Sequence, residues 1–89
     1  MSKIAKDACQ KYTKLGFPNL HAKVGDTGLK AIYEHDLKAA KVVSKLTDCD
    51  RVFFVAYSES RSTYPNELVS FVDCTNGRRF YVKNGVIID

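Results

Sequence analysis

The fold is decided by the last quarter of the chain, which reads Leu68-Val-Ser-Phe-Val-Asp-Cys-Thr-Asn-Gly-Arg-Arg-Phe-Tyr-Val-Lys-Asn-Gly-Val-Ile-Ile-Asp89. It contains two Asn-Gly dipeptides, Asn76-Gly77 and Asn84-Gly85, each flanked by β-branched and aromatic residues. Asn-Gly supplies the two positive φ angles of a type I′ turn, whose twist matches that of paired strands. The sequence therefore predicts two hairpins with two-residue loops, which join strands at about 68–75, 78–83 and 86–88.

The turn at Asn76-Gly77 also predicts the register of the first hairpin. It places Thr75 opposite Arg78 and, further along, Phe71 opposite Val82. Side chains alternate along a strand, so this register assigns each residue to a face of the sheet. The face expected to receive a helix carries Val69, Phe71, Phe80, Val82 and Ile87. The second face is expected to carry Ser70, Val72, Cys74, Arg79, Tyr81, Lys83, Val86 and Ile88.

The N-terminal residues have the apolar spacing of an amphipathic helix. This spacing predicts a helix over residues 2–15, which Gly16 and Pro18 would end. Phe17 is then expected to fold back onto Tyr12. Beyond it, a weak alternation over residues 20–24 is compatible with a short edge strand.

A second helix is predicted from Asp26 or Thr27 to about residue 46. Its expected inward residues are Leu29, Ile32, Tyr33, Leu37, Ala40 and Val43. Residues 51–58 follow as a strand, because they are rich in β-branched and aromatic residues. The expected fold is α+β, as a single domain over residues 1–89: two N-terminal helices precede a three- or four-stranded antiparallel meander, with a helix packed on one sheet face.

The second sheet face mixes apolar, aromatic and basic residues, and three explanations of it lead to different functions. The first helix could cover it as another core layer. It could instead meet another protein or a second copy of the chain, because Tyr and Arg are enriched at interfaces. In the third explanation, Tyr81, Arg79 and Lys83 form a platform for single-stranded nucleic acid. The third has the least support, since the sequence lacks the dense aromatic and glycine signature of RNA-binding sheets.

The length and the cysteines limit the class of protein. The longest apolar run covers only residues 52–57, far short of the roughly 20 residues that cross a bilayer, and the start of the chain lacks the apolar core of a signal peptide. The three cysteines, Cys9, Cys49 and Cys74, are widely spaced and odd in number, so no disulfide framework is expected. These observations favour a cytoplasmic location without membrane attachment.

The positive charge is concentrated in the first half of the chain. Residues 1–46 contain nine lysines and four acidic residues, whereas residues 47–89 contain five basic and six acidic residues. Such asymmetry can attract nucleic acid or an acidic partner. Lysine is also the ordinary residue for the solvated side of a helix, and we favour that interpretation.

No motif for catalysis, metal binding or nucleotide binding is present. The residues that could supply nitrogen or sulfur metal ligands do not have the spacing of a zinc site; they are Cys9, His21, His35, Cys49 and Cys74. The stretch from Gly25 to Gly28 lacks the lysine of a phosphate-binding loop, and His35-Asp36 is interpreted as an exposed polar pair. We therefore expect no catalytic residues, no metal and no cofactor, and a chain that is not an enzyme.

These points favour a small non-enzymatic protein that acts by occupying a surface of another protein. The expected contact residues lie on the second sheet face and in the polar loop over residues 58–67; they are Arg61, Tyr64, Val72, Arg79, Tyr81 and Lys83. In its size and its lack of family motifs, the chain resembles the compact accessory or inhibitor proteins that bacteriophages and mobile elements carry.

The alternative is a basic nucleic-acid-binding module that contacts phosphates through its lysine-rich helices. The residues expected to make these contacts are Lys3, Lys6, Lys11, Lys14, Lys38, Lys41 and Lys45. The two functions use different parts of the chain, so the positions of these side chains distinguish them.

Overall fold

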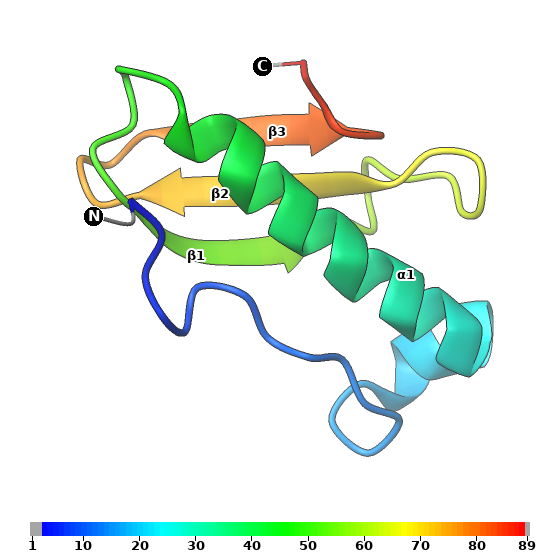
Figure 1. Ribbon diagram of the computed structural model, residues 1–89. Helices are drawn as coiled ribbons and strands as arrows, with labels where there is room; N and C mark the ends of the chain where they lie inside the picture. The colour runs from blue at the N-terminus through cyan, green and yellow to red at the C-terminus, as the bar shows by residue number, and fades with distance from the viewer. Residues whose placement is uncertain (1–2, 89) are drawn as a thin grey trace.

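One helix crosses one face of a four-stranded antiparallel sheet in the computed structural model, which describes residues 3–88 (Figure 1). The helix α1 spans Pro18–Ser44, and the strands are β1 (Val52–Tyr57), β2 (Val69–Cys74), β3 (Arg79–Lys83) and β4 (Val86–Ile87). The strands lie side by side in chain order. The predicted α+β class and antiparallel meander are confirmed, whereas the prediction of two N-terminal helices is not.

Helix α1 contains the second predicted helix and also the seven residues before its kink. Pro18 occupies the first turn of α1 instead of stopping an earlier helix, which suits its fixed φ and its missing N–H. Gly25, with φ of 72°, interrupts the helical backbone, so the predicted edge strand over 20–24 is helical instead. No helix within residues 3–88 has the length and hydropathy needed to cross a membrane.

The N-terminal segment is an irregular loop with turns, so the predicted helix over residues 2–15 is wrong (Ser2 itself lies outside the described residues). The segment pairs with the outer edge of β1: the Val52 N–H donates to the Lys3 carbonyl at 2.6 Å, and the Val55 N–H donates to the Ala8 carbonyl at 2.9 Å. An edge strand offers a row of unpaired backbone groups, whereas a short isolated helix is marginal. Hydrogen bonding to β1 therefore explains why the segment is not helical.

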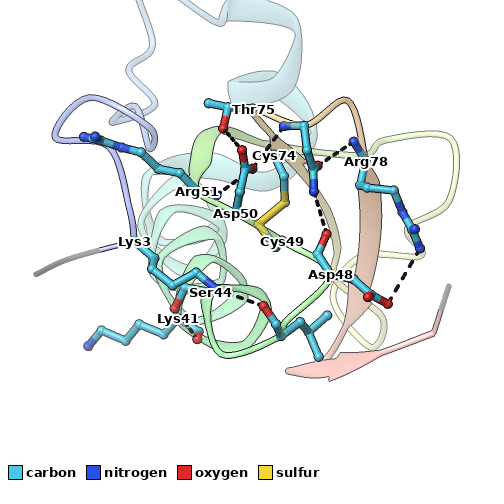
Figure 2. Close-up of a disulfide and its surroundings, with 12 residues drawn as sticks. Lys3, Lys41, Ser44, Asp48, Cys49, Asp50, Arg51, Cys74, Thr75 and Arg78 are labelled. Atoms are coloured by element: carbon cyan, nitrogen blue, oxygen red, sulfur yellow. Dashed lines mark hydrogen bonds and ion pairs between the residues drawn. A yellow bond between two sulfur atoms is a disulfide. The ribbon is translucent and has the colours of Figure 1, made fainter.

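A disulfide joins Cys49, just before β1, to Cys74 at the end of β2 (Figure 2). The two Cα atoms are 5.6 Å apart, and both residues are fully buried. The expectation that the cysteines stay unpaired is therefore wrong for these two. Because disulfides persist mainly in oxidising compartments, cysteine usage no longer supports a cytoplasmic location.

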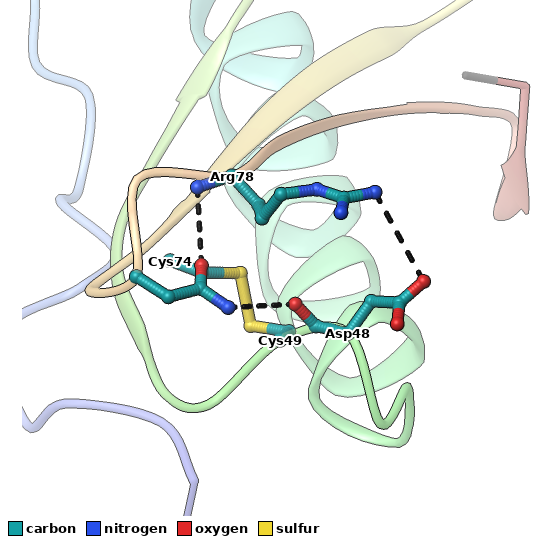
Figure 3. A network of polar contacts seen from close by, with 5 residues as sticks. Asp48, Cys49, Cys74 and Arg78 are labelled. Carbon is teal, nitrogen blue, oxygen red and sulfur yellow. Dashed lines mark hydrogen bonds and ion pairs between the residues drawn. A yellow bond between two sulfur atoms is a disulfide. The ribbon is translucent and has the colours of Figure 1, made fainter.

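Residues on both sides of Cys49 hold the turn after β2. The Asp50 carboxylate accepts hydrogen bonds from the Thr75 hydroxyl at 2.6 Å and from the Asn76 N–H at 3.0 Å (Figure 2). The Asp48 carbonyl accepts from the Asn76 side-chain amide at 2.8 Å, and its carboxylate lies 3.9 Å from the Arg78 guanidinium (Figure 3). We call residues 48–50, with their disulfide, the 48–50 anchor.

The anchored turn has three residues instead of two. The Cys74 N–H donates to the Arg78 carbonyl at 2.8 Å, the Gly77 N–H donates to the Cys74 carbonyl at 3.0 Å, and Gly77 has φ of 90°. This is the three-residue hairpin loop in which glycine takes the left-handed position of a bulge. In the second hairpin, Asn84 and Gly85 both have positive φ, as predicted, and the predicted Val82–Ile87 pair is confirmed.

The longer turn shifts β2 by one residue relative to β3. Phe71 pairs with Tyr81, and Asp73 pairs with Arg79. A one-residue shift exchanges the two faces of a strand, so the predicted faces are wrong for β2 and correct for β3 and β4. The face covered by α1 carries Val52, Val55, Ser70, Val72, Cys74, Phe80 and Val82, all buried, with Ile87 packed beside them.

Reduction of the Cys49–Cys74 disulfide is expected to lower the free energy of unfolding by about 3 kcal/mol, because the bond closes a loop of 25 residues. Urea unfolding with and without a reductant measures this difference, and a count of free thiols before reduction should find Cys9 alone. An unchanged urea midpoint after complete reduction would show that the disulfide does not stabilise the fold.

Candidate interaction surface

The sheet face opposite α1 has no helix on it within residues 3–88, and we call it the open face (Figure 1). Cross-strand pairing sets its side chains in rows: one row holds Phe54, Asp73 and Arg79, and the next holds Ala56, Phe71 and Tyr81. A third row, near the β3–β4 turn, holds Val69, Lys83 and Val86. The explanation that a first helix covers this face is wrong, because residues 4, 5, 8 and 9 pack against the core below α1.

An arginine stacked on an aromatic ring occupies the middle of the open face. The Arg79 guanidinium lies 4.3 Å from the Phe71 ring centroid, and it donates two hydrogen bonds to Asp73, at 2.6 and 2.9 Å. These bonds to Asp73 raise the pKa of Arg79 further above its usual range. The Phe54 ring centroid, in the row of Arg79, lies 5.8 Å from that of Phe71 in the next row. Such cation–π and bidentate contacts fix both side chains in place.

A second arginine reaches the same face from the loop between β1 and β2. The Arg61 guanidinium lies 3.9 Å from the Tyr81 ring centroid. The loop is held at the end of the sheet by Ser62, whose hydroxyl oxygen accepts from the Val69 N–H at 2.8 Å. The sequence-predicted residues Arg61, Arg79 and Tyr81 are thus brought together on one surface.

The remaining predicted contact residues are placed differently. Val72 is fully buried under α1, so it cannot contact a partner, and its prediction is wrong because of the register shift. Tyr64 extends to the other side of the sheet, where a methyl group on Gly28 of α1 would lie 2.9 Å from its hydroxyl oxygen. Lys83 lies on the open face, where its ammonium group is 3.0 Å from the Glu67 carboxylate.

Exposed apolar side chains border the stacked arginines. Phe53, at the bulge of β1, is 47% exposed and shares a shallow hollow with Asp73, Arg78 and Arg79. On the other side, Val86 is 64% exposed and Ile88 is 50% exposed. These side chains place apolar surface on both sides of the arginine–aromatic stacks.

A buried chain of hydrogen bonds beneath α1 was not predicted from the sequence. The Ser70 hydroxyl donates to Asp36 at 2.5 Å, and His35 Nδ1 lies 2.8 Å from the Ser70 oxygen. The Tyr12 hydroxyl donates to the other Asp36 oxygen at 2.5 Å and accepts from the Tyr57 N–H at 2.9 Å. This chain of hydrogen bonds therefore links α1 to β1, to β2 and to the N-terminal segment.

The direction of these hydrogen bonds differs from that of a catalytic triad. The Gly85 N–H donates to His35 Nε2 at 3.1 Å, so the proton of the neutral ring is on Nδ1 and is donated to Ser70. A catalytic serine would instead donate to the histidine. Ser70 and Asp36 are also fully buried, so substrate cannot reach them.

The pKa shifts in this region follow from burial. Burial raises the pKa of Asp36 to about 6, although hydrogen bonds from Ser70 and Tyr12 oppose the shift. Burial, followed by the positive charge of Lys38, lowers the pKa of His35. Burial and then the Asp36 charge raise the pKa of the Cys9 thiol to about 11, so little of the nucleophilic thiolate exists at neutral pH.

The interpretation of His35-Asp36 as an exposed pair is wrong, because both residues are buried. Helical spacing could have revealed this: Asp36 follows Ile32 by four residues and precedes Ala40 by four, inside the apolar stripe of α1. Leu37, which was expected to face inward, is instead 38% exposed.

The lysines of the nucleic-acid alternative are spread over the N-terminal segment and α1. The Lys3 ammonium donates to the Leu46 carbonyl at 2.9 Å (Figure 2), and the side chain of Lys38 lies against Gly85. Lys6, Lys11 and Lys14 are exposed in the N-terminal segment, while Lys41 and Lys45 are exposed at the end of α1.

No three His, Cys, Asp or Glu side chains within residues 3–88 gather closely enough to hold a metal ion.

Comparison of the chain with protein-family models, curated proteins and solved structures finds no match. The geometry of the open face and of the buried chain is therefore the basis for an inference about function.

The raised pKa of Asp36 predicts a specific pH dependence. A carboxyl group whose folded pKa is raised binds more protons in the folded state between about pH 4 and 6, so its contribution to stability falls as the pH rises through this window. The stability of the wild type relative to Asp36→Asn should therefore decrease by up to about 3 kcal/mol from pH 4 to pH 7. Urea unfolding of both proteins over this range measures the difference. The lowered pKa of His35 makes stability rise with pH, but it does so in both proteins and therefore does not contribute to the difference between them. A difference that does not change with pH, or that grows as the pH rises, would contradict this assignment.

Proposed function

We propose that this chain is a non-enzymatic protein that acts by binding another protein through its open face. The observation that carries the proposal is the pair of arginines stacked on Phe71 and Tyr81, on a sheet face that no helix covers within residues 3–88. Arg, Tyr and Phe are enriched at protein interfaces, where they supply much of the binding energy. Because Asp73 and the rings already hold these side chains, binding would immobilise little additional side-chain freedom.

The charge of the open face supports a protein partner. Arg79 is neutralised by Asp73, and Lys83 lies beside Glu67. Among residues 3–88, Arg61 has no acidic partner. A surface with one unpaired cation and exposed apolar borders is better suited to bind a protein surface of apolar and polar residues than the phosphate backbone of a nucleic acid.

The state of the buried polar groups supports a role without catalysis. The side chains of Tyr12, Asp36, Ser70 and His35 all form hydrogen bonds within the protein. The Cys9 thiol has a raised pKa. A protein of this kind acts by covering a surface of its partner, as accessory and inhibitor proteins do. The nucleic-acid alternative has less support, because its lysines are spread over the N-terminal segment and α1, and Lys3 is bound to the end of α1.

The open face predicts which substitutions abolish binding. Arg79→Ala/Tyr81→Ala should weaken the complex with the physiological partner at least tenfold, because it removes one member of each arginine–ring stack. Affinity capture from the organism that encodes the chain, with quantitative mass spectrometry, identifies the proteins that the wild type retains and the variant loses. Titration calorimetry with the purified partner then measures the loss.

A matched variant, Lys45→Ala/Tyr64→Ala, also removes one cation and one aromatic ring but does not alter the open face, and it should bind like the wild type. Phe53→Ser/Ile88→Ser alters only exposed side chains, so it should fold normally and still weaken binding. If capture recovers no protein whose binding depends on these open-face residues, the proposed surface is wrong. Concentration-dependent dimerisation that the same substitutions abolish would identify a second copy of the chain as the occupant instead.

A further inference from the structure

A groove of about 450 Å³ lies between the N-terminal segment and α1, away from the open face. Its apolar lining includes Leu29, Tyr33 and Leu37 of α1, and its charged lining includes Lys11, Lys14 and Lys30. We call it the lysine groove. Its volume falls within the range of about 300–1,000 Å³ that is usual for ligand-binding clefts.

The lysine groove has an excess of unpaired positive charge. None of Lys11, Lys14 and Lys30 forms an ion pair among the described residues. Of the two acidic side chains that also line the groove, Asp26 is bound to His21 at 2.8 Å, and Glu34 has no ion-pair partner within residues 3–88. The groove therefore has three cations available for a ligand and two carboxylates beside them, and its net charge is +1 when His21 is neutral.

Exposed apolar surface lies next to these cations. Leu37 is 38% exposed although it lies on a helix whose other leucines, Leu20 and Leu29, are buried. Tyr33 lies one turn before Leu37 on the same side of α1 and is only partly buried. A ligand that fills the groove would cover Leu37 and Tyr33 and bring its charged groups to the lysines.

We propose that the lysine groove binds an acidic segment of a partner protein, in which carboxylates flank one apolar anchor side chain. The anchor would cover Leu37 and Tyr33, and the carboxylates would pair with Lys11, Lys14 and Lys30. Charge complementarity at the edge of an apolar contact gives specificity and speeds association. The site shares no residue with the open face, so it does not rest on the function proposed there.

A nucleic acid fits this groove less well than an acidic peptide does. Its backbone carries one negative charge per nucleotide, so a strand that crosses the groove would bring phosphates close to Glu34. A peptide can place its few carboxylates against the lysines and leave an uncharged residue beside Glu34. Leu37, the exposed aliphatic side chain of the groove, also suits an apolar anchor better than a base.

An array of twelve-residue peptides tests the proposal over the whole ligand class. Each peptide carries a central Leu, Ile or Phe, flanked by zero to six Glu or Asp residues, and the probe is the full chain at 0.15 M salt. The wild type should bind only peptides that have both the anchor and the acidic flanks. For the best peptides, fluorescence anisotropy should show that Lys11→Gln/Lys14→Gln/Lys30→Gln weakens binding at least tenfold.

The matched control, Lys6→Gln/Lys41→Gln/Lys45→Gln, changes the net charge equally but lies outside the groove, and it should weaken binding less than twofold because salt screens distant charges. Leu37→Ser, at an exposed position, should also weaken binding at least tenfold. Equal losses in the two triple variants, no loss with Leu37→Ser, or no binding to any acidic peptide would overturn the proposal. Tighter binding of a single-stranded oligonucleotide that displaces the peptides would overturn it in favour of nucleic acid.

Discussion

The hold of the 48–50 anchor on the turn after β2 is the constraint on which the rest of the structure depends. The disulfide requires Cys74 to point toward Cys49, and the Asp50 carboxylate binds Thr75 and Asn76 in the turn. A three-residue loop meets both requirements and shifts β2 by one residue relative to β3. That shift buries Val72 under α1 and brings Phe71 and Asp73 to the open face, where Arg79 stacks on one and pairs with the other.

The buried hydrogen bonds around Asp36 lie at the opposite end of the sheet from this anchor. They join α1 to β1 through Tyr12 and to the β3–β4 turn through His35, with Ser70 of β2 between them. Breaking one partner of a satisfied buried network is costly, since the remaining groups stay desolvated. We infer that this chain of hydrogen bonds fixes the position of α1 on the sheet, and that the role of these buried residues is structural.

Local signals in the sequence predicted the elements whose conformation depends on local residues. Asn84-Gly85 formed the predicted two-residue turn, and the apolar stripe containing Ile32 and Val43 predicted which side of α1 is buried. The prediction for Asn76-Gly77 was wrong because residues 48–50, distant in the sequence, decide that turn. The N-terminal helix was wrong for a related reason, since the open edge of β1 is a tertiary feature. Of the candidate contact residues, Arg61, Arg79, Tyr81 and Lys83 reach the open face because their positions do not depend on the register of β2, whereas that of Val72 does.

Nuclear Overhauser spectroscopy of the oxidised, isotope-labelled protein tests the register most directly. The hydrogen bond from Cys74 to Arg78 makes Asp73–Arg79 and Phe71–Tyr81 non-hydrogen-bonded pairs, whose Cα atoms are about 4.5 Å apart. We predict strong Hα–Hα cross-peaks for both pairs. Cross-peaks between Val72 and Tyr81 and between Cys74 and Arg79 would instead indicate a two-residue turn, and they would contradict both the anchored register and the open face built on it.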